Sequence, residues 1–128
     1  KTLDRNIYAN LPSVVGANHI YGRVISGTIV TLTNAGTIAC NMDSGNVFTL
    51  STTAAVGNVQ INATGGVAGQ KVTFIITDDA TGGHVVTFGT NFKSKGTLTG
   101  VVSKTAVLEF TFDGTTWWES TTRVVELS

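Results

Sequence analysis

From Gly22 onward, apolar and polar residues alternate with a period of two in nearly every segment of the chain. Successive side chains of a strand point to opposite faces, so this alternation predicts half-buried β-strands. We expect strands at residues 23–32, 37–42, 46–50, 57–63, 70–77, 84–90, 97–102, 105–112 and 116–124. Short strands about 8–12 residues apart, separated by turn residues, are typical of a sandwich. The pattern therefore predicts an all-β, single-domain antiparallel β-sandwich or jelly roll.

The first 21 residues do not follow this pattern. The segment 1–21 holds the only proline, and its apolar side chains share no clear face. We interpret it as an N-terminal arm that packs along its own domain or a neighbouring subunit, because apolar residues left in water are costly. The alternative is a first, irregular strand of the same sandwich. The predicted organisation is an arm at 1–21 followed by a β-sandwich domain at 22–128.

Residues 108–120 read LEFTFDGTTWWES and predict a hairpin that turns at Asp113-Gly114. Two adjacent tryptophans on one strand cannot enter the same core. A loop of two or four residues places Trp117 on the inward face with Phe112 and turns Trp118 outward, whereas a three-residue loop with a bulge reverses the two. We predict the even loop, with Trp117 in the core.

An outward Trp118 needs an explanation. Leaving a tryptophan in water forgoes burial of about 150–250 Å², an upper bound of about 4–6 kcal/mol. Either a neighbouring loop covers half of the ring, or the ring contacts another subunit or a sugar. We predict that Trp118 belongs to an interface, together with the arm residues Tyr8, Leu11 and Tyr21.

Charge excludes some partners. Charged residues make up 12% of the chain, about half the usual fraction, and eight basic residues balance eight acidic ones. This balance argues against binding to nucleic acid or to an anionic membrane, and no apolar run approaches the roughly 20 residues that span a bilayer. A neutral, charge-poor surface favours association with other protein. Cys40 is the only cysteine, so no intrachain disulfide and no multi-cysteine zinc site can form.

The chain shows no set of residues suited to catalysis. Acid–base chemistry needs paired carboxylates or a nucleophile with its base. Glu109 and Glu119 could be cross-strand neighbours in the last hairpin, but like charges on open strands are more often solvated. We predict no catalytic residues and no enzymatic activity.

Metal and cofactor sites are likewise weakly indicated. His19 and His84 have no metal-ligand spacing, and Asp78-Asp79 in TDDATGGH is most simply a turn. A calcium site at this turn would need several further oxygen ligands. The glycine-rich segment 65–71 lacks phosphate-loop spacing. We therefore expect neither a metal nor a cofactor.

Several elements together resemble a β-rich domain that recurs in tailed-bacteriophage virion proteins, including tail fibres and head decoration proteins. They are a G-Q strand start, a D-x-x-G-G turn before V-x-F, and a closing F-x-F-D-G-T-x-W-x-E with a downstream Arg. In this sequence they correspond to Gly69-Gln70, Asp79 with Gly82-Gly83, Val86 to Phe88, and Phe110 to Glu119 with Arg123. The resemblance covers about residues 40–123, and its recurring tryptophan matches Trp117.

The resemblance implies a structural role in the virion, commonly as a homotrimer, and leaves two hypotheses. In the first, the chain is a trimeric capsid decoration (cement) protein that locks the major capsid protein or other virion proteins, with the arm 1–21 as a clamp. In the second, it is a tail-fibre tip or carbohydrate-binding module in which Trp118, Tyr8 or Tyr21 stacks on a sugar. A short chain with an apolar arm favours the first. Either one predicts a location on the capsid or tail surface.

Overall fold

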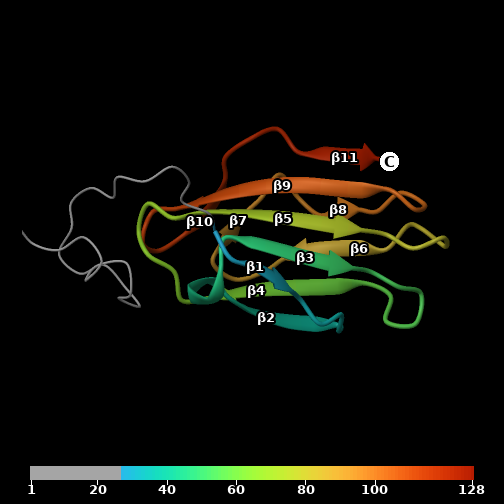
Figure 1. Ribbon diagram of the computed structural model, residues 1–128, viewed down its shortest axis with the longest axis horizontal. Coiled ribbons are helices and arrows are strands. Elements are labelled where there is room, and N and C mark those ends of the chain that lie inside the picture. The colour runs from blue at the N-terminus through green and yellow to red at the C-terminus, as the bar shows by residue number, and fades with distance from the viewer. Residues whose placement is uncertain (1–26) are drawn as a thin grey trace, which may run out of the picture.

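The computed structural model describes residues 27–128 (Figure 1). The predicted arm at 1–21, and with it Tyr8, Leu11 and Tyr21, lies outside the described residues. The described part consists of β-strands and one 3-10 turn, η1 (Met42–Ser44), so the all-β prediction is confirmed there. No helix in this part of the chain is long and apolar enough to cross a membrane.

Most strands fall where the alternation predicts them. The strands are β1 (Ile29–Thr31), β2 (Thr37–Asn41), β3 (Val47–Ser51), β4 (Val59–Thr64), β5 (Lys71–Thr77), β6 (Val85–Phe88), β7 (Phe92–Lys93), β8 (Leu98–Thr99), β9 (Thr105–Phe112), β10 (Trp117–Glu119) and β11 (Val124–Leu127). The predicted strand at 116–124 is wrong in extent, because β10 and β11 are separate. Sequence alternation also missed β7, which is only two residues long.

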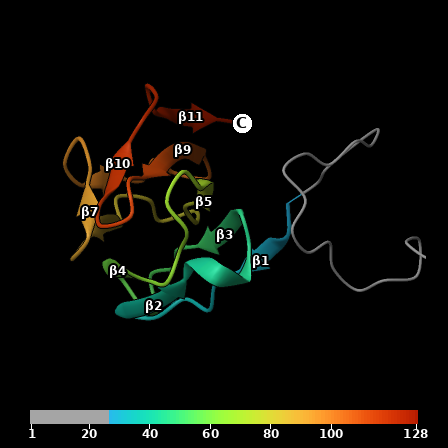
Figure 2. The same cartoon turned by 90° about the vertical axis from the view of Figure 1, so that its left-hand side faces the viewer.

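The first six strands wind as a coil between two sheets. β1, β3 and β5 are parallel neighbours in one sheet, and β2, β4 and β6 are parallel neighbours in the other. Each strand is followed in the chain by a strand of the opposite sheet, so the intervening strand acts as the crossover that a parallel pair requires. Figure 2 separates the layers, with β2 and β4 on one side and β3, β5 and β9 on the other. This is solenoid-like stacking.

Antiparallel strands complete both sheets. β9 pairs antiparallel with β5, and the far edge of β9 receives β10 and β11. β8 pairs antiparallel with β6, while β7 joins β10 in parallel. The antiparallel sandwich prediction is therefore wrong for the coiled half of the domain. Alternation reports which face a side chain occupies and carries no information on the direction of the neighbouring strand.

The core lies between the two sheets and is rich in aromatic rings. Phe74 packs against Phe48 of its own sheet and against Phe88 of the opposite sheet, with ring centroids 5.5 and 5.4 Å apart. The first pair is stacked and the second is edge-to-face, and aromatic pairs at such distances stabilise a core beyond simple burial. Trp117 extends the cluster and stacks on Phe112 at 4.4 Å.

The last hairpin confirms the predicted orientation of the two tryptophans. Trp117 is paired with Phe112, which leaves a four-residue loop at 113–116. The Asp113 carboxylate accepts hydrogen bonds from the backbone N–H groups of Thr115 and Thr116, so the loop is held by its own first residue. Trp117 is 1% exposed and Trp118 is 49% exposed.

Candidate functional site

Four connections meet at one end of the domain, opposite η1 (Figure 1). We call the segments 32–36, 52–58, 78–84 and 100–104 the loop end. Backbone hydrogen bonds join the third and fourth of them: Asp78 N–H donates to the Lys104 carbonyl at 3.0 Å, and Ser103 N–H donates to the Asp79 carbonyl at 3.0 Å. These two segments therefore form one connected surface.

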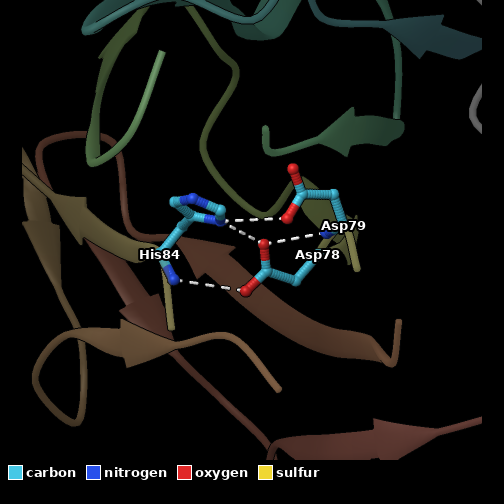
Figure 3. A group of neighbouring side chains, drawn as sticks. All are labelled: Asp78, Asp79 and His84. Atoms are coloured by element: carbon cyan, nitrogen blue, oxygen red, sulfur yellow. Dashed lines mark hydrogen bonds and ion pairs between the residues drawn. The ribbon is translucent and has the colours of Figure 1, made fainter. Parts of the chain in front are cut away.

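Asp78 lies at the centre of the loop end and is 4% exposed. Its carboxylate accepts hydrogen bonds from the Thr52 hydroxyl at 2.8 Å and from the backbone N–H groups of Asp79 and His84. The His84 Nδ1 atom lies 2.5 Å from Asp78 Oδ1 (Figure 3). A buried carboxylate is stable only when such partners replace water, and Asp78 has them on both oxygens.

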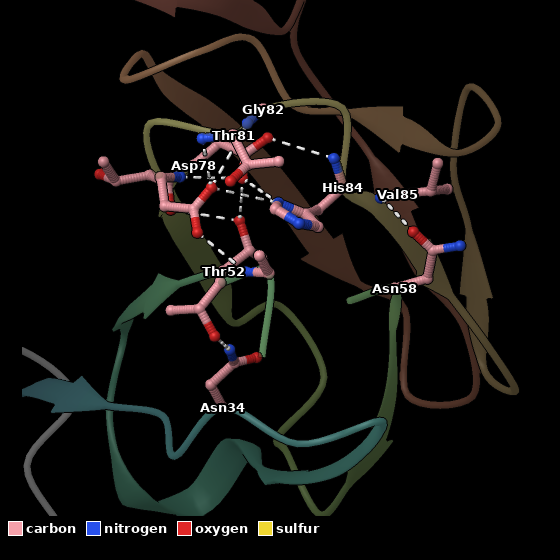
Figure 4. Close-up of polar contacts among 12 residues, drawn as sticks. Asn34, Thr52, Asn58, Asp78, Thr81, Gly82, His84 and Val85 are labelled. Atoms are coloured by element: carbon pink, nitrogen blue, oxygen red, sulfur yellow. Dashed lines mark hydrogen bonds and ion pairs between the residues drawn. The ribbon is translucent and has the colours of Figure 1, made fainter. Parts of the chain in front are cut away.

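Asp79 connects the turn to the neighbouring loop. One of its carboxylate oxygens accepts from the backbone N–H groups of Thr81 and Gly82, and the other accepts from Ala54 N–H at 2.8 Å. The Asp79 carboxylate also lies 3.7 Å from His84 Nδ1. Figure 4 shows Thr52, after β3, beside Asp78, after β5, where a further hydrogen bond joins the same two connections.

The charges of this cluster support one another. Burial alone would raise the pKa of Asp78, but the hydrogen bonds from His84, Thr52 and the backbone outweigh it and hold that pKa below its ordinary value. The hydrogen bond to Asp78 raises the pKa of His84, against the opposing effect of burial. The two shifts together widen the pH range over which a protonated imidazole lies beside an ionised carboxylate.

Asp78, Asp79 and His84 also form the group of described residues that could hold a metal ion, since their ligand atoms lie within 4.8 Å of one another. All four carboxylate oxygens already accept hydrogen bonds, and a metal would require neutral His84. The adjoining cavity of about 10 Å³ has room for about one water molecule. The arrangement fits a structural hydrogen-bond network better than a metal or ligand site.

The cluster contains one contact that the sequence analysis did not predict. Asp78-Asp79 lie in a turn, as predicted, and His84 contacts both carboxylates. The turn returns the chain so that His84, the residue before β6, lies directly beside Asp78. The one sequence signal for this contact is that His84 follows Asp78 by six residues, after the Gly82-Gly83 turn. The same residues also have the ordinary composition of a loop, so the signal is not specific.

Glu109 and Glu119 do not form a carboxylate pair. Glu119 is paired with Phe110 in the strand register, so Glu119 and Glu109 point to opposite faces of the sheet. Glu119 instead binds Arg123, with 2.6 Å between Oε1 and the guanidinium. Arg123 also donates to the carbonyl of Thr97 at 3.0 Å. This pair connects the segment after β10 to the loop before β8, and it leaves no two-carboxylate site here.

A second candidate surface surrounds Trp118. Trp118 lies on the outer face of its sheet, and its indole N–H donates to Asp113 Oδ2 at 2.8 Å. Several hydrogen bonds hold the pKa of the Asp113 carboxyl below its usual range, and the one from the Trp118 indole has the largest effect. The side chain is half exposed, so neighbouring loops cover only part of it. Trp118 is thus an exposed ring with a fixed orientation.

The fold defines a solenoid-like β-domain with a hydrogen-bonded loop end and one fixed, exposed tryptophan. Residues 33–117 match the model of a family described as "putative phage tail fibre C-terminal domain". This match spans more than half of the chain, so the chain belongs to that family and is a structural component of a phage virion. No curated protein and no solved structure matches it. Membership favours the tail-fibre hypothesis over the capsid-decoration hypothesis.

Proposed function

We propose that this domain forms the host-contacting part of a phage tail fibre and binds a surface glycan through Trp118. The observation that carries the proposal is the half-exposed indole, held in place by Asp113. The apolar face of a sugar ring packs on a flat aromatic ring, and nearby polar groups orient its hydroxyls. Because the indole is already anchored, little side-chain entropy is lost on binding.

The surroundings of Trp118 suit a sugar. Thr111 lies directly opposite it on β9, and the same outer face carries Thr73 on β5. Their hydroxyls can donate to and accept from sugar hydroxyls. The expected activity is binding and not catalysis, because Glu109 and Glu119 lie on opposite faces of the sheet and the Asp113 carboxylate holds the indole and the hairpin loop. A homotrimer, as the family resemblance implies, would present three such surfaces on one fibre.

The proposal is tested by applying the full chain to an array of purified bacterial surface polysaccharides. Wild type should bind at least one of them, and Trp118→Ala should bind it about 30-fold more weakly, corresponding to the 2 kcal/mol expected of a binding hot spot. Val102→Ala is the matched control, since Val102 is 51% exposed but lies at the loop end. It should bind like wild type.

Two results would overturn the proposal. The first is equal polysaccharide binding by wild type and Trp118→Ala. The second is a change in oligomeric state on sedimentation of Trp118→Ala, which would make Trp118 a contact between subunits instead of a glycan contact.

A further inference from the structure

The strand register places two lysines in line with Trp118. Lys71 is paired with Thr111, Thr111 with Trp118, and Trp118 with Lys93. The four residues occupy adjacent strands in the order β5, β9, β10 and β7. All four alternate with buried neighbours, so they point to the same outer face of the sheet. We call them the Trp118 row.

The positive charges of the Trp118 row are available to a ligand. Neither Lys71 nor Lys93 forms an ion pair within residues 27–128. The acidic groups on this side already have hydrogen-bond donors: Asp113 accepts from the indole and from two backbone N–H groups, and Glu109 accepts from the Ser120 hydroxyl at 3.2 Å. Within residues 27–128, the surface therefore places two ammonium groups that form no ion pair beside carboxylates that are already held by hydrogen bonds.

The spacing of the row matches an extended ligand. Neighbouring strands lie about 4.8 Å apart. Measured across the strands from backbone to backbone, Lys93 therefore lies about 5 Å to one side of Trp118 and Lys71 about 10 Å to the other. A sugar chain that runs across the strands, with one ring on Trp118, would bring the neighbouring rings over Thr111 and toward each lysine. Lysine side chains are long and rotatable, so they can adjust to the exact position of an anionic group.

We infer that the glycan bound by this surface is an acidic polysaccharide that carries uronic acid carboxylates. This inference rests on the proposed function and deepens it. One sugar ring stacks on Trp118, the Thr111 hydroxyl bonds a ring hydroxyl, and Lys93 and Lys71 pair with carboxylates on either side. Ammonium–carboxylate hydrogen bonds of this kind are stronger than neutral ones, and in an exposed site they are sensitive to salt.

The test compares each polysaccharide that binds wild type in the array with its carboxyl-reduced form, in which every uronic acid is converted to the neutral sugar of the same ring and linkage. The polysaccharides that bind should be acidic, and reduction should weaken binding about 4- to 25-fold, because two exposed ion pairs that each contribute about two- to fivefold are lost. Raising the salt concentration to about 1 M should narrow this difference, because the screening length falls to about 3 Å.

Lysine variants locate the effect. Lys71→Ala and Lys93→Ala should each weaken binding of the acidic form by about two- to fivefold, without changing the binding of the reduced form. Lys104→Ala removes the same charge at the loop end, where Lys104 contacts Ser128, and should leave the preference for the acidic form intact.

The failure of this inference differs from the failure of the proposed function. Equal binding of acidic and reduced forms, or binding only of neutral polysaccharides, would overturn the acidic assignment while Trp118-dependent binding stood. If all three lysine variants lost the preference for the acidic form equally, the acidic assignment to this surface would also be overturned, because the preference would then reflect the total charge of the protein. Acidic binding that survives Trp118→Ala would overturn both.

Discussion

Replacing Trp117 by alanine should remove much of the stability of the domain. Trp117 is 1% exposed, stacks on Phe112 with 13° between the ring planes, and lies on β10, between β9 and β7 in the sheet. The backbone of Gly66 lies against the Trp117 ring and carries no side chain that could move into the space. A large cavity should therefore remain.

The size of the loss follows from the buried surface. A fully buried tryptophan removes about 150–250 Å² from water, which at about 25 cal/mol per Å² gives an upper bound of about 4–6 kcal/mol. Measured Trp→Ala changes in cores cost about 3–5 kcal/mol. Domains of this size are stable by about 5–15 kcal/mol in total. We expect a loss of about 3–5 kcal/mol in the free energy of unfolding.

Urea unfolding followed by far-ultraviolet circular dichroism measures this loss. Trp118→Ala is the matched control and should cost no more than about 1 kcal/mol, since its ring is half exposed and its indole bond is at the surface. If Trp117→Ala fails to fold, Trp117→Phe should fold with a loss of about 1–2 kcal/mol. The reasoning is refuted if Trp118→Ala is destabilised more than Trp117→Ala or Trp117→Phe.

Three further predictions test other parts of the fold. Gly66→Ala should destabilise by about 1–3 kcal/mol, because its φ is +106° and the new methyl would lie 2.6 Å from the Trp117 ring. Gly57→Ala, with φ +80° and open space, should cost less in the same urea titration. The pKa of His84 is higher in the folded protein than in the unfolded chain, where it is near 6.5. Protonated His84 therefore stabilises the fold fully at pH values below about 6.5, and this stabilisation is lost as the pH rises through the folded-state pKa. The melting-temperature advantage of wild type over His84→Gln should therefore shrink as the pH rises above about 6.5, and an advantage that grows would contradict this reasoning. Burial raises the pKa of the Cys40 thiol to about 12, so iodoacetamide should leave it unmodified in native buffer and modify it fully in urea, as read by mass spectrometry.

The Trp118 surface was partly predictable. The parity of the hairpin assigned Trp118 to the outside, because the loop length and the two-residue period together decide the face. The lysines beside it could not be assigned in the same way. Lys93 lies beside Trp118 because β7 pairs in parallel with β10. These two strands are separated in the chain by β8 and β9. No local pattern reports such a pairing.

The Asp78–His84 pair shows a similar division. A turn at Asp78-Asp79 is encoded locally, since aspartate and glycine accept the backbone angles that turns require. The burial of Asp78 depends on Thr52 and on the loop before β9, which arrive from distant parts of the chain. The Asp78 carboxylate has enough hydrogen-bond donors to be buried only because these segments meet in the folded domain. Its contact with His84 forms in the same place.

The sequence by itself determined that the chain forms strands, where most of them lie, and which side chains face inward, including Trp117. The tertiary structure decided that the first six strands run parallel within each sheet and alternate between two sheets. The physical reason is that side-chain alternation is a property of one strand, whereas direction and partner depend on hydrogen bonds between backbone groups far apart in the chain. Those bonds form equally well for many side-chain patterns, so only packing of the complete core between β3, β5, β4 and β6 selects among them.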